Sequence, residues 1–250
     1  MYPFEPRSDW ANLHRPALRT RMIDEDVRTF LALHPRGTVC ELGCGLASRF
    51  DRLDNGLVRW FDLDLPKVIA VRRQFFDDRP RCSMIAASVT DNKWIEQLQH
   101  SGGPWCFVSE AVFVYLDPTE VRHVFETINE QFPGAWVLTD TAARRLIDNR
   151  VSREAVPQVP SVSGFRWTCD DPRTLESWTP GLCLDRSRSL LDLSPSLRQR
   201  LPWRLRISLG LGRLRKRHPA RDYRLNRFVC SRRVANTKYE AGAWSQASLV

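Results

Sequence analysis

The stretch from Val39 to Phe76, VCELGCGLASRFDRLDNGLVRWFDLDLPKVIAVRRQFF, decides the fold of this chain. It begins with a short apolar run that ends in Gly43-Cys-Gly45, and this pattern predicts a strand that enters a tight turn. A second apolar run ends at Leu63. Pro66 stands just beyond it, where the fixed φ of proline suits the first position of a helix. We therefore expect two strands of one sheet here, with a helix after the second.

Strands and helices continue to alternate as far as residue 140, which is typical of a parallel sheet covered on both faces. The expected strands are 38–42, 58–63, 83–89, 105–110 and 135–140, and the expected helices are 67–76, 92–100 and one opened by Asp117-Pro118. Two later runs, 182–193 and 223–231, indicate an antiparallel finish, and Pro16–Leu33 has helical spacing before the first strand. We expect an α/β fold: a doubly wound, Rossmann-like, mostly parallel sheet with an antiparallel final strand and a helical cap.

The composition is that of a folded domain. The 250 residues are 42% hydrophobic and 27% charged, which excludes a disordered chain and a coiled coil. No apolar run has the length of a membrane span and the N-terminus lacks a secretion signal, so we expect a cytoplasmic protein. The seven cysteines are scattered without a CxxC pair, and we expect neither a disulfide framework nor a metal site. We expect a single domain over 1–250, with a core from 36–150 and 181–233 and cap elements from 1–35, 151–180 and 194–222.

The turn after the first strand has the composition of a nucleotide-like ligand site. Gly43 and Gly45 let the backbone turn sharply and approach a ligand closely at the carboxyl ends of the strands. An acidic residue about 20 residues on, Asp62 or Asp64, suits the two hydroxyls of a ribose, because one carboxylate accepts both protons. A dinucleotide site prefers a third glycine beneath the pyrophosphate, and this chain has Ser48 there. The pattern therefore favours a ligand without phosphates, such as S-adenosylmethionine.

Three sets of residues carry a resemblance to a known family. They are the stretch Val39–Phe76, the run Ser109-Glu-Ala-Val-Phe-Val-Tyr-Leu116, and Phe165-Arg-Trp167 with Asp170-Asp-Pro172. Over roughly residues 16–230 the chain resembles the leucine carboxyl methyltransferase family, in particular its bacterial branch of polyketide O-methyltransferases. The resemblance implies a class I methyltransferase fold with S-adenosylmethionine as the cofactor. One departure is Ala47-Ser48-Arg49, where the family usually has Asp-Thr-Arg, so a carboxylate near the cofactor is missing.

The resemblance also implies a set of cofactor-binding residues at matching positions: Arg19, Gly43, Gly45, Asp64, Ser88, Val89 and Glu110. Gly43 matches the glycine beneath the methionine part of the cofactor, and Asp64 matches the ribose-binding acid. Ser88 and Val89 match the pair beside the adenine.

Two further matches concern the charged groups of the cofactor. Glu110 matches the acid that faces the sulfonium and the amino group, with an ion pair to a neighbouring arginine as the alternative. Arg19 matches the arginine that binds the cofactor carboxylate, with Arg21 as the competing residue.

The expected activity is transfer of the sulfonium methyl group to a small, natural-product-like acceptor. Tyr115 and Asp140, near the expected strand tips, are the candidates to line the acceptor site. A carboxylate or a hydroxyl oxygen is the favoured acceptor atom. A carboxylate is ionised at pH 7 and needs no base, whereas a phenol or thiol must lose its proton. A protein C-terminal carboxyl group and a small-molecule thiol stay open as acceptors. A basic protein that binds RNA or a membrane surface is the alternative outside the enzymes.

The net charge of +9 is concentrated in one segment. Between Arg186 and Arg233 there are 15 Lys or Arg and two acidic residues, a balance of +13, so the rest of the chain sums to −4. A nucleic-acid-binding protein usually carries its basic surface on the main fold, so a nucleic-acid partner is disfavoured. Within this segment, 197–217 combines leucines at helical spacing with many arginines. It is interpreted as a helix with solvated arginines, as a cap that attracts an acidic acceptor, or as a surface that binds lipid or nucleic acid.

Overall fold

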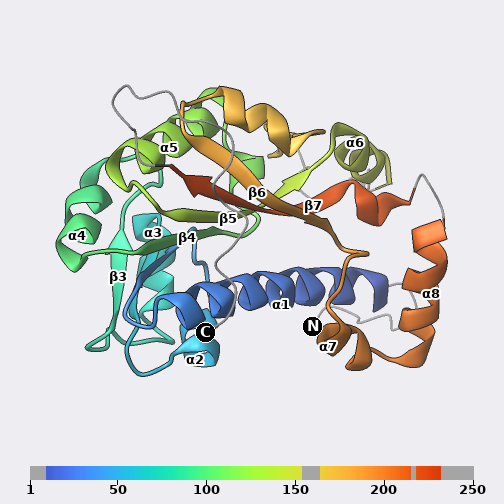
Figure 1. Ribbon diagram of the computed structural model, residues 1–250, viewed down its shortest axis with the longest axis horizontal. Helices are drawn as coiled ribbons and strands as arrows, with labels where there is room; N and C mark the ends of the chain where they lie inside the picture. The colour runs from blue at the N-terminus through green and yellow to red at the C-terminus, as the bar shows by residue number, and fades with distance from the viewer. Residues whose placement is uncertain (1–9, 154–163, 215–217, 232–250) are drawn as a thin grey trace, which may run out of the picture.

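The computed structural model describes residues 10–153, 164–214 and 218–231, and these build a seven-stranded sheet with the order β3-β2-β1-β4-β5-β7-β6 (Figure 1). The strands are β1 Thr38–Leu42, β2 Arg59–Asp64, β3 Cys82–Ala86, β4 Trp105–Ser109, β5 Trp136–Ala142, β6 Leu182–Ser189 and β7 Tyr223–Cys230. The first five strands pair in parallel, and β7 lies antiparallel between β5 and β6. The expected doubly wound sheet with an antiparallel finish is confirmed.

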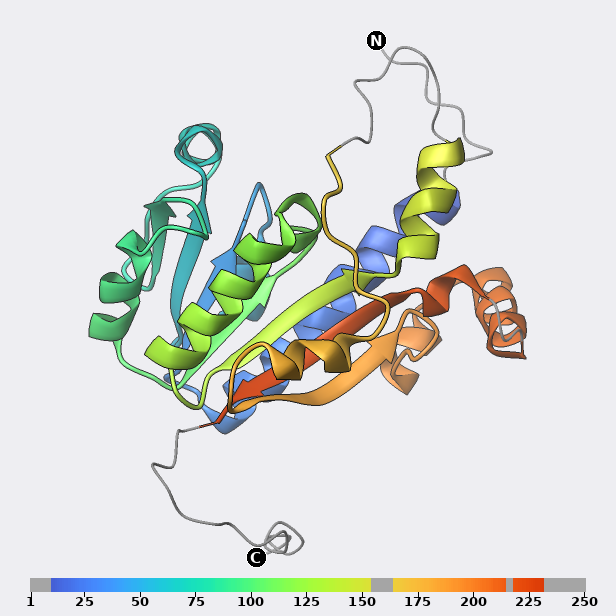
Figure 2. The same ribbon diagram turned by 90° about the horizontal axis from the view of Figure 1, so that it is seen from above.

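Helices cover both faces of this sheet. They are α1 Trp10–Leu33, α2 Arg49–Leu53, α3 Pro66–Arg72, α4 Lys93–Ser101, α5 Pro118–Gln131, α6 Arg144–Arg153, α7 Pro195–Gln199 and α8 Trp203–Leu214, with 3₁₀ turns η1 Phe113–Tyr115, η2 Pro172–Ser177 and η3 Pro219–Arg221. The long α1 runs along one face, α4 and α5 lie on the other, and α8 stands at the side of the molecule beyond the start of β7 (Figures 1 and 2).

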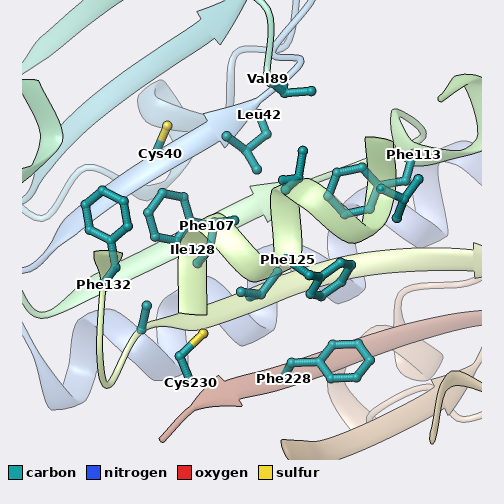
Figure 3. Packing of buried hydrophobic residues seen from close by; sticks show 14 of the residues in the cluster. Cys40, Leu42, Val89, Phe107, Phe113, Phe125, Ile128, Phe132, Phe228 and Cys230 are labelled. Atoms are coloured by element: carbon teal, nitrogen blue, oxygen red, sulfur yellow. The ribbon is translucent and has the colours of Figure 1, made fainter. Parts of the chain in front are cut away.

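The alternation of side chains along the strands explains this two-sided cover. In β1, Val39 belongs to the apolar cluster beneath α1, while Cys40 and Leu42 belong to the cluster beneath α4 and α5. Figure 3 shows the second cluster, in which Phe107 of β4 and Phe228 of β7 pack with residues of α5. Both faces of the central strands are therefore buried, and the loops at the strand ends are free to form a site.

The sequence of α5 shows why a helix forms there. Asp117 and Glu120 make a capping box, in which the Glu120 side chain accepts the Asp117 backbone N–H at 2.7 Å. Pro118 takes the first helical position, where its missing N–H has no helical partner to lose. The apolar face of the helix is completely buried, and each such side chain contributes about 1.5–3 kcal/mol.

Several expected elements have different boundaries in the structure; the helix expected over 67–76, for example, ends at Arg72. The third strand ends at Ala86, because Ser88 enters a turn in which its hydroxyl contacts that of Thr90 at 2.8 Å. The sixth strand ends at Ser189, whose backbone N–H bonds to Asp192 in another turn. The helix expected over 197–217 is divided into α7 and α8, because Pro202 cannot donate a helical hydrogen bond. Residues 215–217 lie outside the described residues.

Candidate cofactor and acceptor site

The loop after β1 is shaped by its two glycines. Gly43 and Gly45 have positive φ values of +72° and +51°, which favour glycine. The Gly43 N–H donates to the Leu63 carbonyl at 2.7 Å, and a Cβ on Gly43 would lie 2.3 Å from Val112 Cγ2. A Cβ on Gly45 would meet no heavy atom within 4 Å. The loop therefore packs tightly against the sheet at Gly43 and faces open space at Gly45.

Asp64 holds this loop from the end of β2. Its Oδ2 accepts the Gly45 N–H and its Oδ1 accepts the Leu65 N–H, both at 2.7 Å. A carboxylate has about four acceptor positions, so two remain for the hydroxyls of a ligand. The competing Asp62 is buried, and it accepts hydrogen bonds from Trp60 Nε1 at 2.9 Å and from Arg72 at 2.6 Å. Of the two acids, the geometry leaves Asp64 the better placed to meet a ligand.

Arg72 is a residue of this region that the sequence analysis did not identify. From α3 it donates to the carbonyls of Gly45 at 3.0 Å and Ala47 at 2.8 Å, and it forms an ion pair with Asp62. Arg72 thus binds carbonyl groups of the loop after β1, while Asp64 binds the Gly45 N–H of the same loop. No motif marks this role, because it depends on where α3 packs.

Ser88 and Val89 lie in the loop after β3, next to the end of β2. The adjacent Ala87 N–H donates to the Asp64 carbonyl at 3.0 Å, which places this loop beside the Asp64 backbone. Ser88 is half-buried and Val89 is buried. The residues matched to the adenine and to the ribose are therefore neighbours at one edge of the sheet.

Glu110, directly after β4, is surrounded by donors. Its Oε1 accepts Arg19 Nε at 2.7 Å and the Thr20 hydroxyl at 2.6 Å, and its Oε2 forms an ion pair with Arg49. Burial raises the pKa of Glu110, but the two arginines and Thr20 outweigh it and hold the pKa below its ordinary value. The arginine pairing considered as the alternative for Glu110 is thus present, and Arg19 supplies part of it. Arg21, the competing arginine, is exposed.

Arg49 is the centre of a buried ionic cluster. Its side chain is fully buried and forms ion pairs with Glu41, with Glu110 and with Asp24, the last at 2.9 Å. Asp24 comes from α1 and also pairs with Arg52 at 3.1 Å. This chain has Ala47 where the family usually has an aspartate. Asp24 of α1 supplies a carboxylate to the same region, because it pairs with Arg49.

Glu41 belongs to the same cluster, and its pKa is higher than that of an ordinary glutamate. Burial raises its pKa to about 7, although Arg49 acts in the opposite direction. Its Oε2 is buried without a hydrogen-bond partner in the described structure. The cluster therefore contains one carboxylate oxygen that can accept a further donor.

A second network joins the ends of β4, β5 and β7. The Asp140 carboxylate accepts the Ala111 N–H at 2.9 Å and the hydroxyl proton of Tyr223, and Tyr223 in turn accepts from Arg19 at 3.0 Å. Tyr223 reaches Asp140 because it pairs with Ala142, two residues further along β5 and hence on the same face. Ala111 has φ +57°, a value that non-glycine residues rarely adopt, so Asp140 stabilises a strained turn beside Glu110.

Two cavities adjoin this network. The first has a volume of about 110 Å³ and is lined mainly by aromatic and aliphatic side chains; Arg19, Ala111, Tyr115, Asp140, Phe165, Trp167 and Tyr223 are among its residues. The second has a volume of about 100 Å³, shares Arg19, Leu146 and Tyr223 with the first, and is otherwise lined by Pro16, Leu190, Pro219 and Ala220. Tyr115 and Asp140, the two candidates for the acceptor site, thus lie in one cavity.

The segment after residue 163 provides one wall of the first cavity. The backbone N–H of Arg166 donates to the Val114 carbonyl at 2.8 Å, and that of Cys169 donates to the Ala142 carbonyl at 2.9 Å. These bonds place Phe165 and Trp167 across the cavity from the strand tips, with the Phe165 ring 5.3 Å from that of Tyr115. In the sequence these aromatic residues belong only to a family pattern, and no local signal assigns them to the site.

The tips of β1, β2 and β4 fit S-adenosylmethionine in the chemistry of their donors and acceptors. Asp64 offers free acceptor positions to ribose hydroxyls, and the unpartnered oxygen of Glu41 and the carboxylate of Glu110 suit a ligand with cationic groups. Arg19 supplies a cation for a carboxylate. The open space at Gly45 leaves room beside the loop.

Comparison with solved structures identifies the fold. Similar folds include the plantazolicin methyltransferase BpumL with S-adenosylhomocysteine (TM-score 0.58, 11% identity, 90% of this chain and 88% of that chain). Another is the magnesium protoporphyrin IX methyltransferase of Synechocystis PCC 6803 (TM-score 0.54, 11% identity, 92% of this chain and 90% of that chain). The fold is that of a class I S-adenosylmethionine-dependent methyltransferase.

Sequence comparison identifies the family. The family model for leucine carboxyl methyltransferase matches residues 7–129. The tetracenomycin polyketide synthesis O-methyltransferase TcmP of Streptomyces glaucescens is 31% identical over 194 residues, 77% of this chain and 70% of that protein. The methyltransferase dpfgK of Gibberella zeae is 28% identical over 180 residues, 66% of this chain and 60% of that protein. This chain belongs to the leucine carboxyl methyltransferase family, and it is an S-adenosylmethionine-dependent methyltransferase.

These findings confirm the family, the enzyme class and the cofactor expected from the sequence. The roles of the individual site residues stay predictions. Among the helices that the structure describes, none is long and apolar enough to cross a membrane.

Proposed function

We propose that this methyltransferase acts on an oxygen of a small, mainly apolar acceptor, and that the acceptor binds in the first cavity. The observation that supports this most strongly is the position of the cavity directly beside the matched cofactor residues. Arg19 forms an ion pair with Glu110 and also lines the cavity, and Ala111 follows Glu110 and lines it as well. A bound acceptor would therefore lie next to the end of the cofactor that carries the methyl group.

The lining of the first cavity indicates the chemistry of the acceptor. Tyr115, Phe165 and Trp167 offer aromatic surface, which favours a flat, apolar molecule. Arg19 lines the same wall, where its guanidinium lies 3.7 Å from Asp140, and it is the cation that an anionic group of the acceptor would meet. The printed name of TcmP describes an O-methyltransferase of polyketide synthesis, which is consistent with an acceptor of this kind.

A carboxylate is the favoured acceptor group, because its methylation in this cavity needs no general base. Asp140 is the one carboxylate among the residues that line it, and that side chain already accepts the Ala111 N–H and the Tyr223 hydroxyl proton. Asp140 is therefore placed to orient the cavity wall and is poorly placed to remove a proton. An acceptor that is already ionised at pH 7 needs no such base.

In this proposal one set of residues binds the cofactor and a second set positions the turn between the cofactor and the acceptor. Bound S-adenosylmethionine supplies an activated methyl group on a cationic sulfur. Asp64, Glu110 and Arg19 hold and orient the cofactor through its ribose, its cationic groups and its carboxylate. Asp140 and Tyr223 fix the turn at Ala111 and so the distance between the two binding regions, and correct placement supplies most of the rate in an in-line displacement.

The experiment is transfer of labelled methyl from S-adenosylmethionine to a matched panel of acceptors. The panel contains aromatic acids, their amides, phenols, aryl thiols and a peptide with a free C-terminal carboxylate. We expect label in the aromatic acids and none in the amides. Label in the thiols alone, or in the peptide alone, would replace this proposal by the corresponding alternative.

Two variants connect the activity to the cavity. Tyr115→Ala removes an aromatic wall, and we expect it to raise the acceptor KM about tenfold, the effect of losing roughly 1.4 kcal/mol of apolar contact. Its affinity for the cofactor should stay unchanged. Phe75→Ala is the matched control, because Phe75 is 67% exposed and lies after the end of α3 that points away from the strand tips. An unchanged acceptor KM in Tyr115→Ala would exclude the first cavity as the acceptor site.

A further inference from the structure

The helix α8 carries an exposed apolar stripe. Trp203, Ile207, Leu211 and Leu214 follow one another at intervals of four, four and three residues, so they lie on one face of the helix. Their exposed fractions are 61%, 54%, 55% and 81%. Exposed leucines occur singly on most proteins, but a row of this kind, with a tryptophan at its start, marks an interaction surface.

The body of the protein holds the opposite face of α8. Leu209 packs against the apolar cluster beneath α1. Arg213 Nε donates to the Leu191 carbonyl at 2.9 Å, and Arg221 donates to the Arg213 carbonyl at 2.8 Å. The helix is thus fixed at the side of the molecule (Figures 1 and 2). The exposed fractions of the stripe residues show that the stripe faces solvent.

The segment of sequence that carries the stripe is strongly basic. Between Asp192 and Asp222 the sequence contains nine Lys or Arg and no acidic residue. On α8 itself, Arg204 and Arg206 are exposed, and the Arg204 guanidinium lies 5.3 Å from the Trp203 ring. A partner that fits this surface is apolar where it contacts the stripe. It carries negative charge where it contacts the flanking arginines.

The two cavities beside Arg19 do not involve this helix. No residue of α7 or α8 is among those that line either cavity, although Pro219 and Ala220 of the following turn line the second. A second copy of the chain is also a poor partner, because pairing two such helices would bring their arginines together. A nucleic acid would satisfy the arginines but would leave the aliphatic stripe in water.

We propose that α8 binds the surface of a membrane that contains anionic phospholipid. The stripe enters the boundary between headgroups and acyl chains, and the flanking arginines contact the phosphates. The 12 residues of the helix span about 18 Å at 1.5 Å per residue, which suits a helix that lies in the plane of the interface. This property does not depend on the acceptor that the enzyme methylates.

The test is co-sedimentation of the full-length protein with vesicles of phosphatidylcholine alone and of phosphatidylcholine with phosphatidylglycerol. We expect at least tenfold stronger binding to the anionic vesicles, since each basic residue near such a surface contributes a factor of about five. The double variant Ile207→Gln/Leu211→Gln and the double variant Arg204→Gln/Arg206→Gln should each lose most of this binding. Leu33→Gln/Phe75→Gln, which changes exposed apolar residues elsewhere, is the matched control and should bind like the unchanged protein.

Cofactor affinity, which all three variants should retain, shows that each is folded. Equal binding to both kinds of vesicle, or full binding by Ile207→Gln/Leu211→Gln, would overturn the proposal. A change from dimer to monomer in that variant, without vesicle binding by the unchanged protein, would assign the stripe to self-association. Retention on an RNA homopolymer that only the arginine variant loses, again without vesicle binding, would assign the helix to nucleic acid.

Discussion

Arg19 on α1 donates from Nε to Glu110 Oε1 at 2.7 Å across a separation of 91 residues. This ion pair connects the leading helix to the tip of β4, and the same arginine contacts the Tyr223 hydroxyl at the tip of β7. The leading helix is therefore part of the candidate site, because its Arg19 contacts both the predicted cofactor residue Glu110 and the cavity residue Tyr223.

Replacement of Glu110 tests whether its carboxylate faces the cationic end of the cofactor. Glu110→Gln keeps the shape of the side chain and removes its charge. We expect affinity for S-adenosylmethionine to fall by roughly 1.5–3 kcal/mol, the value of a charged hydrogen bond. Affinity for S-adenosylhomocysteine, whose sulfur is neutral, should fall less. Calorimetric titration with both ligands measures the difference, and equal losses would assign Glu110 to the ion pairs alone.

Replacement of Asp64 tests the ribose contact. Asp64→Asn should weaken cofactor binding by about 1.5–3 kcal/mol, because the amide cannot accept two hydroxyl protons in the same way. Asp62→Asn is the matched control, since that buried side chain pairs with Arg72 and Trp60, and the change should lower thermal stability instead. A folded Asp64→Asn protein with unaltered affinity would contradict the assignment.

The buried cluster around Arg49 makes a strong prediction about stability. Arg49→Met leaves Asp24, Glu41 and Glu110 without their shared cation, and breaking a buried pair in this way costs about 3–5 kcal/mol. The deficit should shrink as the pH falls, because protonation removes the unpaired charges. Arg52→Met removes a partly exposed arginine that also contacts Asp24 and should cost about 1 kcal/mol or less. Denaturant unfolding of both variants at pH 5 and pH 8 measures the contrast.

Glu41 should give the protein a pH-dependent loss of stability. Burial raises its pKa from 4.5 to about 7, so between these values the folded chain binds more protons than the unfolded chain. The contribution of Glu41 to stability is therefore full below pH 4.5 and falls as the pH rises toward 7. Glu41→Gln cannot titrate, so the difference in unfolding free energy between the two proteins should change across this window. A constant difference from pH 4.5 to 8 would show that Glu41 is ionised throughout.

Tyr223 and Asp140 should affect the acceptor more than the cofactor. Tyr223→Phe removes the hydroxyl that joins Arg19 to Asp140 and leaves the aromatic wall in place. We expect a lower kcat and a raised acceptor KM, with cofactor affinity within twofold of the original. Asp140→Asn should have the larger effect, because it also weakens the bond that holds the Ala111 turn. Steady-state kinetics measures the effect on the acceptor, and calorimetry measures the effect on cofactor binding. A loss of cofactor affinity as large as the rise in acceptor KM would mean that the network supports both binding regions.

Most of the sheet was predictable because its signals are local. The alternation of apolar runs with helical spacing, and the glycines after β1, indicate each strand and its exit independently of the rest of the chain. The division of the helix over 197–217 was also predictable from Pro202, whose missing N–H interrupts a helix.

The ionic clusters were not predictable in the same way. Arg49 meets Asp24 only because α1 packs against the sheet, and it meets Glu110 because β4 pairs with β1. Nothing near Arg49 in the sequence indicates which acids surround it. Tyr223 enters the first cavity only because β7 pairs with β5 in a particular register. Such residues emerge from tertiary contacts, whereas Asp64 and Glu110 follow strands and can be assigned from a motif.

The position of β7 between β5 and β6 has a consequence for the order in which the protein is assembled during translation. The cofactor-side residues are synthesised by residue 110, and Tyr223 follows 113 residues later (223 minus 110). At roughly 5–20 residues per second the ribosome needs about 6–23 s for that interval. Until β7 arrives, β5 is the open edge of a parallel sheet, with unpaired backbone groups exposed. The nascent chain thus completes the candidate cofactor residues at the tips of β1, β2 and β4 first, and the proposed acceptor cavity is complete only when β7 inserts.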